Sequence, residues 1–501
     1  MILQKRKQTI LISASYAPHS LTMVICKCLT LLLLVYRIEA KLTVTNDRYY
    51  PRYHLAPPAG WMNDPNGFSV YRGEYHVFYQ HNPNSSFVTG TAHWGHAKSK
   101  DLLTWKHLPI AMYPNNTYDA NGVFSGCALI EDDVMYLYYT AHKTYPGQAP
   151  SQIERQALAV STDGVNVVKY ENNPILLADD RQPDIRDPKV WKHGSTYYMV
   201  LGNKFQVDGA DRGRVLLYSS QDKYNWTEVA IIGESDGKLG YMWECPDFFQ
   251  LNGRFILLFS PQGVQPEGDK YKNLYQTGYI VGDFDYDTLV FKPLTEFQEL
   301  DHGHDIYATQ TILDNLGRRI VIAWFDMWEN NYPEQGDGFN GQITIPRILT
   351  LTKDLHINQR PVPEIRAART NIVRTGSAGG CATATLKNKA GEVNIRASVS
   401  KDLELFIEGT NVTLLIYYSA SCGQISLDRA GDLRRTEWQP INVLILNIFI
   451  DASSIEVFCG DGEVTMSSRY FTDGDVTIRL GDNSEVDQFR VINMKSTVPI
   501  N

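Results

Sequence analysis

The sequence repeats one pattern five times at a nearly constant interval, as a tight turn followed by an aromatic or aliphatic strand. The five stretches are YRGEYHVFYQ, EDDVMYLYYT, KHGSTYYMVL, LNGRFILLFS and LGRRIVIAWF. Their turns lie at Gly73, Asp132, Gly194, Gly253 and Gly317. A period of roughly 60 with several strands in each unit is typical of β-propeller blades. A long meander or sandwich with coincidental spacing is the alternative.

The remainder of the chain also has the pattern of strands. Helical periodicity is scarce, and alternation resumes beyond residue 400 in DLELFIEG, VTLLIYYSA and INVLILNIFID,. We therefore predict an all-β chain. A five-bladed β-propeller is expected at residues 41–355, a proline-containing linker at 356–366 and a C-terminal β-sandwich at 367–501. The sandwich region has no cluster of carboxylates and histidines, so we expect it to be structural.

Residues 1–40 have the composition of a secretory signal peptide. Basic residues 5–7 precede an apolar run at 22–36, and a small-residue cleavage site follows at 38–40,. A membrane anchor is the alternative, but Lys27 interrupts the run and a span needs about 20 apolar residues. Met23 is a second candidate start. We expect a secreted, extracellular protein without a membrane span in its mature form.

The charge balance argues against a polyanionic partner. The formal net charge is −9, and beyond residue 40 the chain has 42 basic and 55 acidic residues. An acidic protein repels nucleic acid, so none is expected as a partner. A neutral substrate fits better.

Sequons and cysteines agree with an exported glycoprotein. Candidate glycosylation sites are Asn84, Asn115, Asn225 and Asn411,. Five cysteines lie beyond residue 40, an odd number too thinly spread for a disulfide framework, and no CxxC suggests a metal,. A disulfide within the group Cys381, Cys422 and Cys459 is left open.

An unusual polar cluster precedes the turn in every repeat. Asp64 lies nine residues before its turn, Ser125 seven, Asp187 seven, Glu244 nine and Asp305 twelve. These positions fall on the expected first strand of each blade, and first strands line the central channel. Residues up to about 240 positions apart should therefore meet at one end of the axis,. Clustered carboxylates raise one another's pKa, which favours a functional explanation.

Two carboxyl groups that face one bond are the minimum equipment for glycoside hydrolysis. Glu244 is the expected proton donor, since Trp243, Phe248 and Phe249 could desolvate it and raise its pKa. Asp64 is the expected anion, because the side-chain and backbone donors of Asn63, Asn66 and Gly67 would keep it ionised. Arg186 would likewise hold Asp187 charged.

Each of these segments alone also has a structural explanation. Asn-Asp-Pro-Asn-Gly and Arg-Asp-Pro are common turn sequences, and Trp-Glu-Cys-Pro by itself says little. Their shared position within the repeat favours the catalytic explanation.

Seven motifs follow one another along the chain: GWMNDPNG, FYQ (78–80), HWGHA (93–97), FSG (124–126), RDP (186–188), ECPD (244–247) and DHGHDIYATQ (301–310). Together they resemble glycoside hydrolase family 32, which contains invertases, other β-fructofuranosidases and fructan hydrolases. The resemblance runs from about residue 50 to the IEVFCGDGE stretch. It implies the same propeller and sandwich, and a retaining double displacement.

The resemblance also implies residue roles. Asp64 would form the fructosyl-enzyme ester, Glu244 would act as acid/base and Asp187 would hold fructose hydroxyls. The implied substrate-binding residues are Trp61, Met62, Asn63, Gln80, Trp94, Phe124, Ser125, Arg186, Asp301 and Asp305. Of these, Trp94 and Phe124 would line the pocket, and Asp301 or Asp305 would face the leaving-group subsite. Because carboxylates do the proton work, no metal or cofactor is expected.

The motif spellings resemble bacterial-type sucrose-cleaving members, in a protein whose signal and sequons suggest a eukaryotic host. Some such members act on sucrose 6-phosphate, but an exported acidic protein favours sucrose itself, with raffinose or short fructans as further substrates. An exo-fructanase or fructosyltransferase is the alternative within the family. A catalytically silent fructoside-binding propeller is the alternative outside enzymes, although a lectin has no need of an acid/base.

Overall fold

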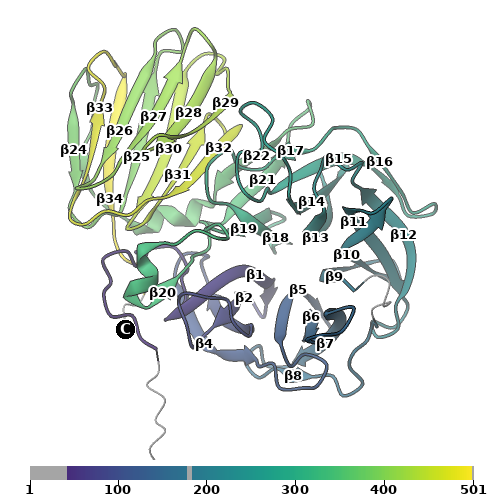
Figure 1. Cartoon of the computed structure of the whole chain (residues 1–501). Coiled ribbons are helices and arrows are strands. Elements are labelled where there is room, and N and C mark those ends of the chain that lie inside the picture. The colour runs from purple at the N-terminus through teal and green to yellow at the C-terminus, as the bar shows by residue number, and fades with distance from the viewer. Residues whose placement is uncertain (1–41, 178–182, 499–501) are drawn as a thin grey trace, which may run out of the picture. The chain divides into compact units, whose positions relative to one another are not determined.

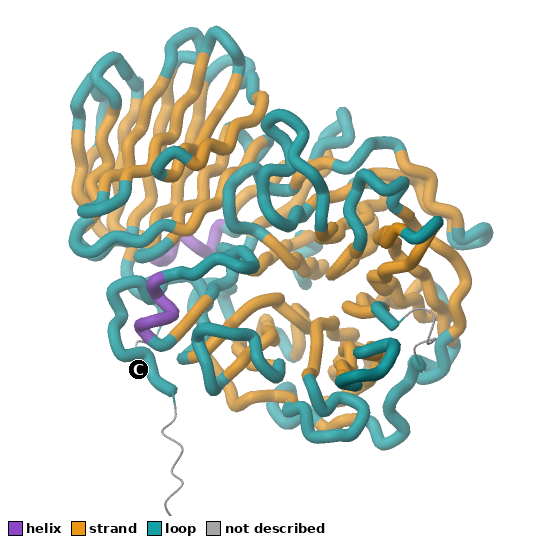
Figure 2. The backbone as a smooth tube through the Cα atoms, in the orientation of Figure 1, coloured by secondary structure: helices purple, strands orange, loops and turns teal. Residues whose placement is uncertain are grey.

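The computed structural model of the chain describes residues 42–177 and 183–498. These residues contain 34 strands and two short 3-10 helices, so the prediction of an all-β chain is confirmed (Figures 1 and 2). The predicted signal peptide at 1–40 and the second candidate start lie outside the described residues. Within the described ranges, no helix has both the length and the apolar character needed to cross a bilayer.

Residues 60–361 form five sheets that follow one another along the chain. The first sheet contains β20 (Phe339–Asn340), β1 (Gly60–Tyr71), β2 (Glu74–Asn82), β3 (His93–Ser99) and β4 (Trp105–Met112). The second contains β5 (Gly122–Glu131), β6 (Val134–Thr144), β7 (Gln152–Ser161) and β8 (Val168–Lys169). The third contains β9 (Ile185–His193), β10 (Thr196–Val207), β11 (Ala210–Ser220) and β12 (Thr227–Glu234).

The fourth and fifth sheets complete this series. The fourth contains β13 (Met242–Leu251), β14 (Arg254–Gln262), β15 (Gly278–Asp285), β16 (Val290–Pro293) and β17 (Gln298–Glu299). The fifth contains β18 (Tyr307–Leu313), β19 (Arg319–Trp324), β21 (Arg347–Leu351) and β22 (Ile357–Pro361). The helix η1 (Pro333–Asp337) precedes β20.

The five sheets are arranged in a closed cycle around their first strands (Figure 1). Strand β1 contacts β5, β5 contacts β9, β9 contacts β13, β13 contacts β18, and β18 contacts β1 again. Strand β20 comes from the end of this region and pairs with β1, where Gly60 is opposite Phe339. This pairing joins the last part of the region to the first sheet.

The predicted turns join the first and second strands of each sheet. In the first, second and fourth sheets the two turn residues both have positive φ: 49° and 79° at Arg72 and Gly73, 50° and 59° at Asp132 and Asp133, and 48° and 83° at Asn252 and Gly253. Two consecutive left-handed residues match the right-handed twist of the flanking strands, which explains the Gly and Asp at these positions.

Apolar residues fill the space between successive sheets. Five buried clusters each combine residues of two neighbouring sheets, and one of them joins the fifth sheet to the first through Ile312, Ile320 and Phe68. Because each sheet buries both faces, its strands are apolar almost throughout rather than alternating. The aromatic and aliphatic stretches that repeat in the sequence form the second strand of each sheet.

Residues 369–494 form two six-stranded sheets. One contains β23 (Arg369–Arg374), β34 (Gln488–Met494), β25 (Gly391–Ala397), β30 (Leu444–Asp451), β31 (Ser454–Cys459) and β32 (Val464–Arg469). The other contains β24 (Thr383–Leu386), β33 (Val476–Leu480), β26 (Leu403–Glu408), β27 (Thr413–Ser419), β28 (Gln424–Arg429) and β29 (Asp432–Glu437). A single apolar cluster contains residues of both sheets, so their facing sides form one core,.

The stretch predicted as a linker at 356–366 is structured. Residues 357–361 form β22, which pairs with β21, and the helix η2 (Pro363–Ala368) follows. Both prolines are compatible with this structure. Pro361 is the last residue of an edge strand, and Pro363 is the first residue of η2, so neither has to donate a ladder hydrogen bond,.

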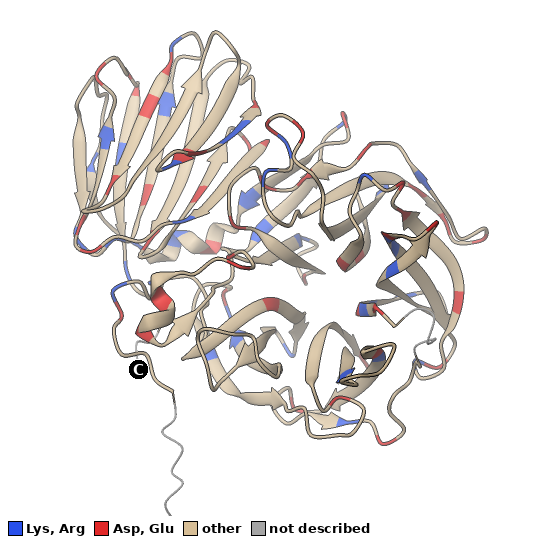
Figure 3. Cartoon of the chain, in the orientation of Figure 1, with Lys and Arg blue, Asp and Glu red and all other residues tan. Residues whose placement is uncertain are grey.

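The other features of the sequence are placed as follows. Among the described residues all five cysteines are free, and Cys459 is buried in the core of the C-terminal sheets. The four sequon asparagines are exposed, so glycosylation at them stays a prediction compatible with the fold. Basic and acidic residues are interspersed over strands and loops in the view of Figure 3.

Candidate active site

In every one of the five sheets, the pairing between the first and second strands is interrupted at the polar cluster. The register shifts lie between Met62 and Pro65 in β1, Phe124 and Gly126 in β5, Arg186 and Lys189 in β9, Glu244 and Asp247 in β13, and Tyr307 and Thr309 in β18. Such bulges leave a residue out of the ladder and re-aim its side chain. The five first strands are therefore all deformed at the same level of the ring.

Proline explains three of these interruptions. Pro65, Pro188 and Pro246 directly follow Asp64, Asp187 and Cys245. Proline has no N–H to donate to the ladder, so regular pairing ends there. Asp187 and Cys245 also have positive φ values of 66° and 48°, a backbone conformation that costs free energy for residues other than glycine,.

Two predicted carboxylates meet at the thiol of Cys245. Its Sγ lies 3.5 Å from Oδ2 of Asp64 and 3.8 Å from Oδ2 of Asp187. The backbone N–H of Cys245 also donates to Oδ2 of Asp187 at 2.9 Å. Glu244 is the preceding residue. Strands β1, β9 and β13 thus bring together Asp64, Asp187 and Glu244, which are far apart in the sequence.

Asp64 is a buried carboxylate with three donors. Ser125 Oγ donates to Oδ2 at 2.6 Å, Asn63 Nδ2 donates to Oδ1 at 2.9 Å, and the Cys245 thiol also faces Oδ2. Burial, followed by the charge of Glu244, raises the pKa of Asp64, while these hydrogen bonds oppose the rise,. Asn66, which we expected among the donors, instead accepts a hydrogen bond from the backbone of Gly126.

Glu244 is surrounded by polar donors rather than by the expected aromatic side chains. Arg186 donates to Oε1 through Nε at 2.9 Å and through Nη2 at 2.7 Å. Gln262 Nε2 donates to Oε2 at 2.7 Å, and the hydroxyl of Tyr307 donates to the same oxygen. The predicted neighbours Trp243, Phe248 and Phe249 belong to the apolar clusters between sheets, because side chains alternate along a strand,.

Asp187 differs from the expectation that Arg186 holds it charged. Burial and the charge of Glu244 raise the pKa of Asp187 well above its usual value, and Arg186 only partly opposes them. The guanidinium of Arg186 is directed to other carboxylates, since Nη1 donates to Glu154 at 3.1 Å and Nη2 to Glu244. Arg186 therefore organises the acid/base candidate rather than its neighbour in sequence.

Three other predicted residues lie beside the interrupted pairings of the first and second sheets. Trp61 Nε1 donates to Asn63 Oδ1 at 2.9 Å and orients the amide that contacts Asp64. Gln80 lies opposite the β1 bulge, and its Nε2 has no hydrogen-bond partner within the described chain. Phe124 is half-buried and stacks on His142 with ring centroids 4.1 Å apart.

Two predicted binding residues lie behind the site instead of lining it. Trp94 is fully buried, and its Nε1 donates to the backbone carbonyl of Phe124 at 3.0 Å. Met62 is also fully buried, in the apolar cluster between the fifth and first sheets. Both side chains point into the packing between sheets, so their predicted contact with substrate is wrong in this structure.

Comparison with known proteins places the chain in a family. Residues 54–361 match the Glycosyl hydrolases family 32 N-terminal domain, and residues 353–496 match the Glycosyl hydrolases family 32 C terminal. The chain belongs to glycosyl hydrolase family 32. This membership confirms the predicted resemblance and makes the protein a glycoside hydrolase.

Relatives of this family 32 chain cover most of its length. A sucrose-6-phosphate hydrolase of Zymomonas mobilis is 39% identical over 463 residues, which cover 86% of this chain and 88% of that protein. A raffinose invertase of Escherichia coli is 37% identical over 440 residues, which cover 86% and 91%. The solved structure of a Bombyx mori GH32 β-fructofuranosidase mutant in complex with sucrose has a TM-score of 0.85. It is 42% identical and covers 95% of this chain and 99% of that chain.

In this family 32 chain, Asp301 has a structural role and does not face the predicted leaving-group subsite. Its Oδ2 accepts from Arg347 Nη1 at 3.0 Å and from Ser467 Oγ at 2.7 Å. Its Oδ1 accepts the backbone N–H groups of Gly303 and Ser467, each at 2.8 Å. Asp301 therefore fixes the segment before β18 against β32.

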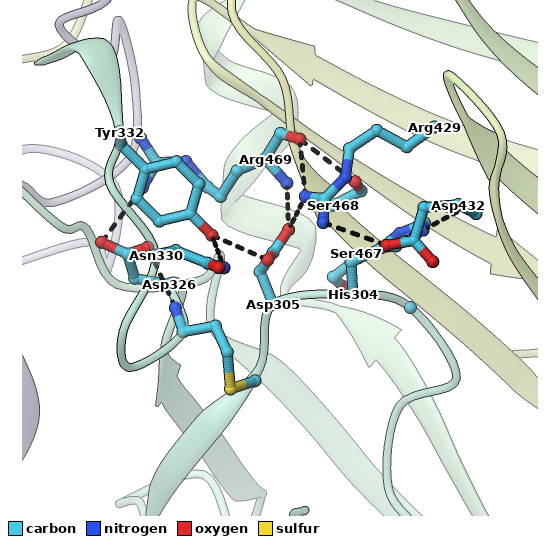
Figure 4. Close-up of polar contacts among 12 residues, drawn as sticks. His304, Asp305, Asp326, Asn330, Tyr332, Arg429, Asp432, Ser467, Ser468 and Arg469 are labelled. Atoms are coloured by element: carbon cyan, nitrogen blue, oxygen red, sulfur yellow. Dashed lines mark hydrogen bonds and ion pairs between the residues drawn. The ribbon is translucent and has the colours of Figure 1, made fainter. Parts of the chain in front are cut away.

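Asp305 is likewise fully engaged away from the carboxylate cluster (Figure 4). Arg429 Nη1 donates to its Oδ2 at 2.5 Å, the backbone N–H of Arg469 donates to the same oxygen at 2.7 Å, and the Tyr332 hydroxyl donates to Oδ1 at 2.8 Å. The spacing in the sequence already set Asp305 apart from the other clusters. Asp305 is twelve residues before its turn, whereas the other clusters are seven to nine. The fifth bulge lies at Tyr307–Thr309, closer to that turn.

Several residues that were not predicted from the sequence contact the predicted set. These are Glu154, Cys245, Gln262, Tyr307 and Trp328. Trp328 stacks on Trp61 with ring centroids 6.1 Å apart. Cys245 lies within the ECPD motif and Tyr307 within DHGHDIYATQ. The other three lie on later strands or loops, where only the tertiary structure brings them near.

Proposed function

We propose that this family 32 hydrolase cleaves the terminal non-reducing β-D-fructofuranoside bond of sucrose to glucose and fructose. The observation that carries the proposal is the meeting of Asp64 of β1 and Asp187 of β9 at the buried thiol of Cys245 in β13, directly after Glu244. Two differently surrounded carboxyl groups at one site are what glycoside hydrolysis requires.

The proposed reaction is a retaining double displacement. Asp64 attacks the anomeric carbon of the fructosyl unit and forms an ester, while Glu244 gives its proton to the glucose oxygen. Glu244 then takes a proton from water, and the resulting hydroxide attacks the anomeric carbon and releases Asp64 as a carboxylate. The donors on Asp64 suit a group that must start as an anion,.

The surrounding side chains have matching roles. Arg186, Gln262 and Tyr307 fix the orientation of the Glu244 carboxyl group toward the leaving oxygen,. Within the described chain, only Oδ2 of Asp187 has a hydrogen-bond partner, so Oδ1 is available to a fructose hydroxyl. Gln80, whose Nε2 is buried and has no partner within the described chain, is a second proposed contact of the sugar.

Sucrose is favoured over sucrose 6-phosphate by the charges at the site. Some relatives are named for the phosphorylated sugar, and a Bombyx mori relative is solved with sucrose. The one guanidinium among the predicted site residues, that of Arg186, is already paired with Glu154 and Glu244. A phosphate would have to compete for it with the buried carboxylate of Glu154 and the half-buried one of Glu244,. Raffinose is a further proposed substrate, since an E. coli relative is named for it.

We further propose that the five-sheet cycle is a five-bladed β-propeller and the two six-stranded sheets a β-sandwich. The cyclic contacts of the first strands and the five clusters between sheets support the former, and the shared apolar core supports the latter,. Secretion and glycosylation are proposed from the apolar run at 22–36 and from the exposure of the four sequons.

The test is a comparison of sucrose, sucrose 6-phosphate, raffinose and inulin as substrates of the purified protein, with released fructose and glucose measured. Sucrose should be the best of the four in kcat/KM, and Asp64→Ala should abolish activity. Asp283→Ala, on the exposed surface, is the matched control and should retain it. A preference for inulin would establish the exo-fructanase alternative. Transfer of fructose to sucrose would establish the fructosyltransferase alternative. Binding of a fructoside without hydrolysis of any substrate would establish the silent propeller.

A further inference from the structure

Residues of all five first strands line a cavity that is separate from the catalytic residues. Its volume is about 450 Å³, within the range of small-molecule sites,. Among its lining residues are Phe68 of β1, Lys189 of β9, Asp247 of β13 and Thr311 of β18. Each lies two to four residues beyond the polar cluster or bulge of its own strand, which corresponds to roughly 7–13 Å along a strand,.

A layer of hydrogen-bonded groups separates the two sites. Gln310 Nε2 donates to the backbone carbonyl of Gly126 at 2.7 Å, and Gln310 Oε1 accepts the backbone N–H of Phe68 at 3.3 Å. The N–H of Gly126 donates to Asn66 Oδ1 at 3.1 Å. These contacts cross the ring between the first, second and fifth sheets, so a ligand of the cavity would not share the catalytic carboxylates.

Three charged side chains of the cavity converge on Thr311. Asp247 Oδ2 accepts both the backbone N–H and the hydroxyl of Thr311 at 2.9 Å. Lys189 Nζ donates to the Thr311 carbonyl at 2.7 Å and pairs with the same carboxylate oxygen at 2.9 Å. Arg319 Nη1 donates to the Thr311 hydroxyl at 3.3 Å. Two cations and one anion leave this cluster one positive charge in excess.

Arg319 supplies the excess charge. Within the described residues it has no carboxylate partner, and Nη1 is the one guanidinium nitrogen with a hydrogen-bond acceptor. The guanidinium carbon lies 4.5 Å from the centroid of the Phe249 ring, and burial lowers the pKa of Arg319,. By contrast, Lys192 at the same cavity has a carboxylate partner, Glu131 at 2.5 Å, which it shares with Lys223. An uncompensated cation in a protein of net charge −9 favours an anionic ligand,.

Much of the rest of the lining is aromatic or aliphatic, beside polar residues such as His193 and Gln250. Trp191, Phe255 and Tyr286 line the cavity and are only partly buried, and Trp191 Nε1 donates to the Tyr286 hydroxyl at 3.0 Å. Exposed residues such as Leu313 and Asn315 line it as well, so it is open to solvent. We propose that this cavity binds a small organic monocarboxylate, with its anion against Arg319 and Lys189 and its apolar part against the aromatic rings.

Benzoate is the probe that tests the proposal, with benzyl alcohol as its neutral counterpart. Isothermal titration of the full chain should give saturable benzoate binding with Kd about 1 mM or tighter, and at least about tenfold weaker binding of benzyl alcohol. Arg319→Met should weaken benzoate binding at least about tenfold, which is the loss of one charge-assisted contact. Arg254→Met, which changes an exposed arginine paired with Asp283, should leave binding unchanged.

A second variant and a competition keep the test decisive. Ala128 lines the cavity on β5, and Ala128→Met should fill it and also weaken benzoate binding, even if Arg319→Met does not fold. Fructose at saturating concentration should not displace benzoate, because the catalytic residues are separate. The proposal is overturned by absence of saturable binding, by equal binding of benzyl alcohol, by unchanged affinity in folded variants, or by displacement with fructose.

Discussion

Asp305 and Arg429 form an ion pair of 2.5 Å between the loop before β18 and the end of β28, although they are 124 positions apart in sequence. Asp305 is fully buried, and Arg429 is mostly covered. The Tyr332 hydroxyl and the backbone N–H of Arg469 complete the hydrogen bonds of the carboxylate. The ion pair therefore links the C-terminal sheets to the segment that leads into β18, the first strand of the fifth sheet.

Arg429→Ala should destabilise the protein by about 2 kcal/mol, because it leaves a buried carboxylate with one charge partner fewer. The value is at the low end for buried pairs, since two other donors remain and Arg429 is partly exposed. Arg435→Ala removes an exposed partner of Asp269 and should cost well under about 1 kcal/mol,. Urea unfolding midpoints of both variants check this, and equal losses would contradict it.

Ser125→Ala should move the acidic limb of the pH–kcat/KM profile to higher pH. The Ser125 hydroxyl donates to Asp64, and this hydrogen bond lowers the pKa of the carboxylate against the effect of burial. Without it the pKa of Asp64 rises, so the nucleophile becomes protonated at a higher pH, and we expect a shift of about 0.5–1 unit. Ser421→Ala, at an exposed position, serves as the control. If the rate falls but the acidic limb of the profile stays at the same pH, the hydrogen bond from Ser125 does not affect the ionisation of Asp64.

Glu244→Gln should lose about 10³-fold in kcat on sucrose, the range of general acid catalysis. Much of the lost rate of the first step, in which the ester on Asp64 forms, should be recovered with a fructoside whose leaving group needs no protonation. The glutamine keeps the size of the side chain but cannot give or take the proton. Mass spectrometry of the variant with such a fructoside should then detect the covalent adduct on Asp64. Equal loss on both substrates would argue against the acid role.

His54 should make stability depend on pH. Its Nδ1 lies 2.7 Å from Asp451 and its Nε2 2.8 Å from Glu456, with all three side chains fully buried. Burial alone would lower the pKa of His54, but the two carboxylates raise it to about 9 in the folded protein, against an ordinary value of 6.5. Protonated His54 with its two carboxylates therefore stabilises the fold fully below pH 6.5, and this contribution is lost as pH rises through 9,.

The expected contribution is about 3 kcal/mol. The measurement is the free energy of unfolding of wild type and His54→Gln between pH 6 and 9.5, where the common titrations of other groups cancel in the difference. The wild type should lose its advantage toward the upper end of this range. An advantage that is constant with pH would contradict the assignment.

Local sequence signals determined the strands, the five turns and the polar position within each repeat. Turn residues with positive φ and aromatic β-formers act over a few residues, so they can be identified without the fold. The prolines after Asp64, Asp187 and Cys245 belong to the same class, since their missing N–H groups interrupt the ladder wherever the strand pairs,.

Only the tertiary structure decided which side chains face one another. Arg186 turns from the adjacent Asp187 to Glu154 and Glu244, and Asp305 pairs with Arg429 rather than facing a sugar. Such pairings depend on which strands neighbour each other and on which side of a bulge each side chain leaves, and sequence distance carries neither. The effect of burial on pKa also depends on the tertiary structure, because the neighbours that set the charge of a buried group come from other sheets.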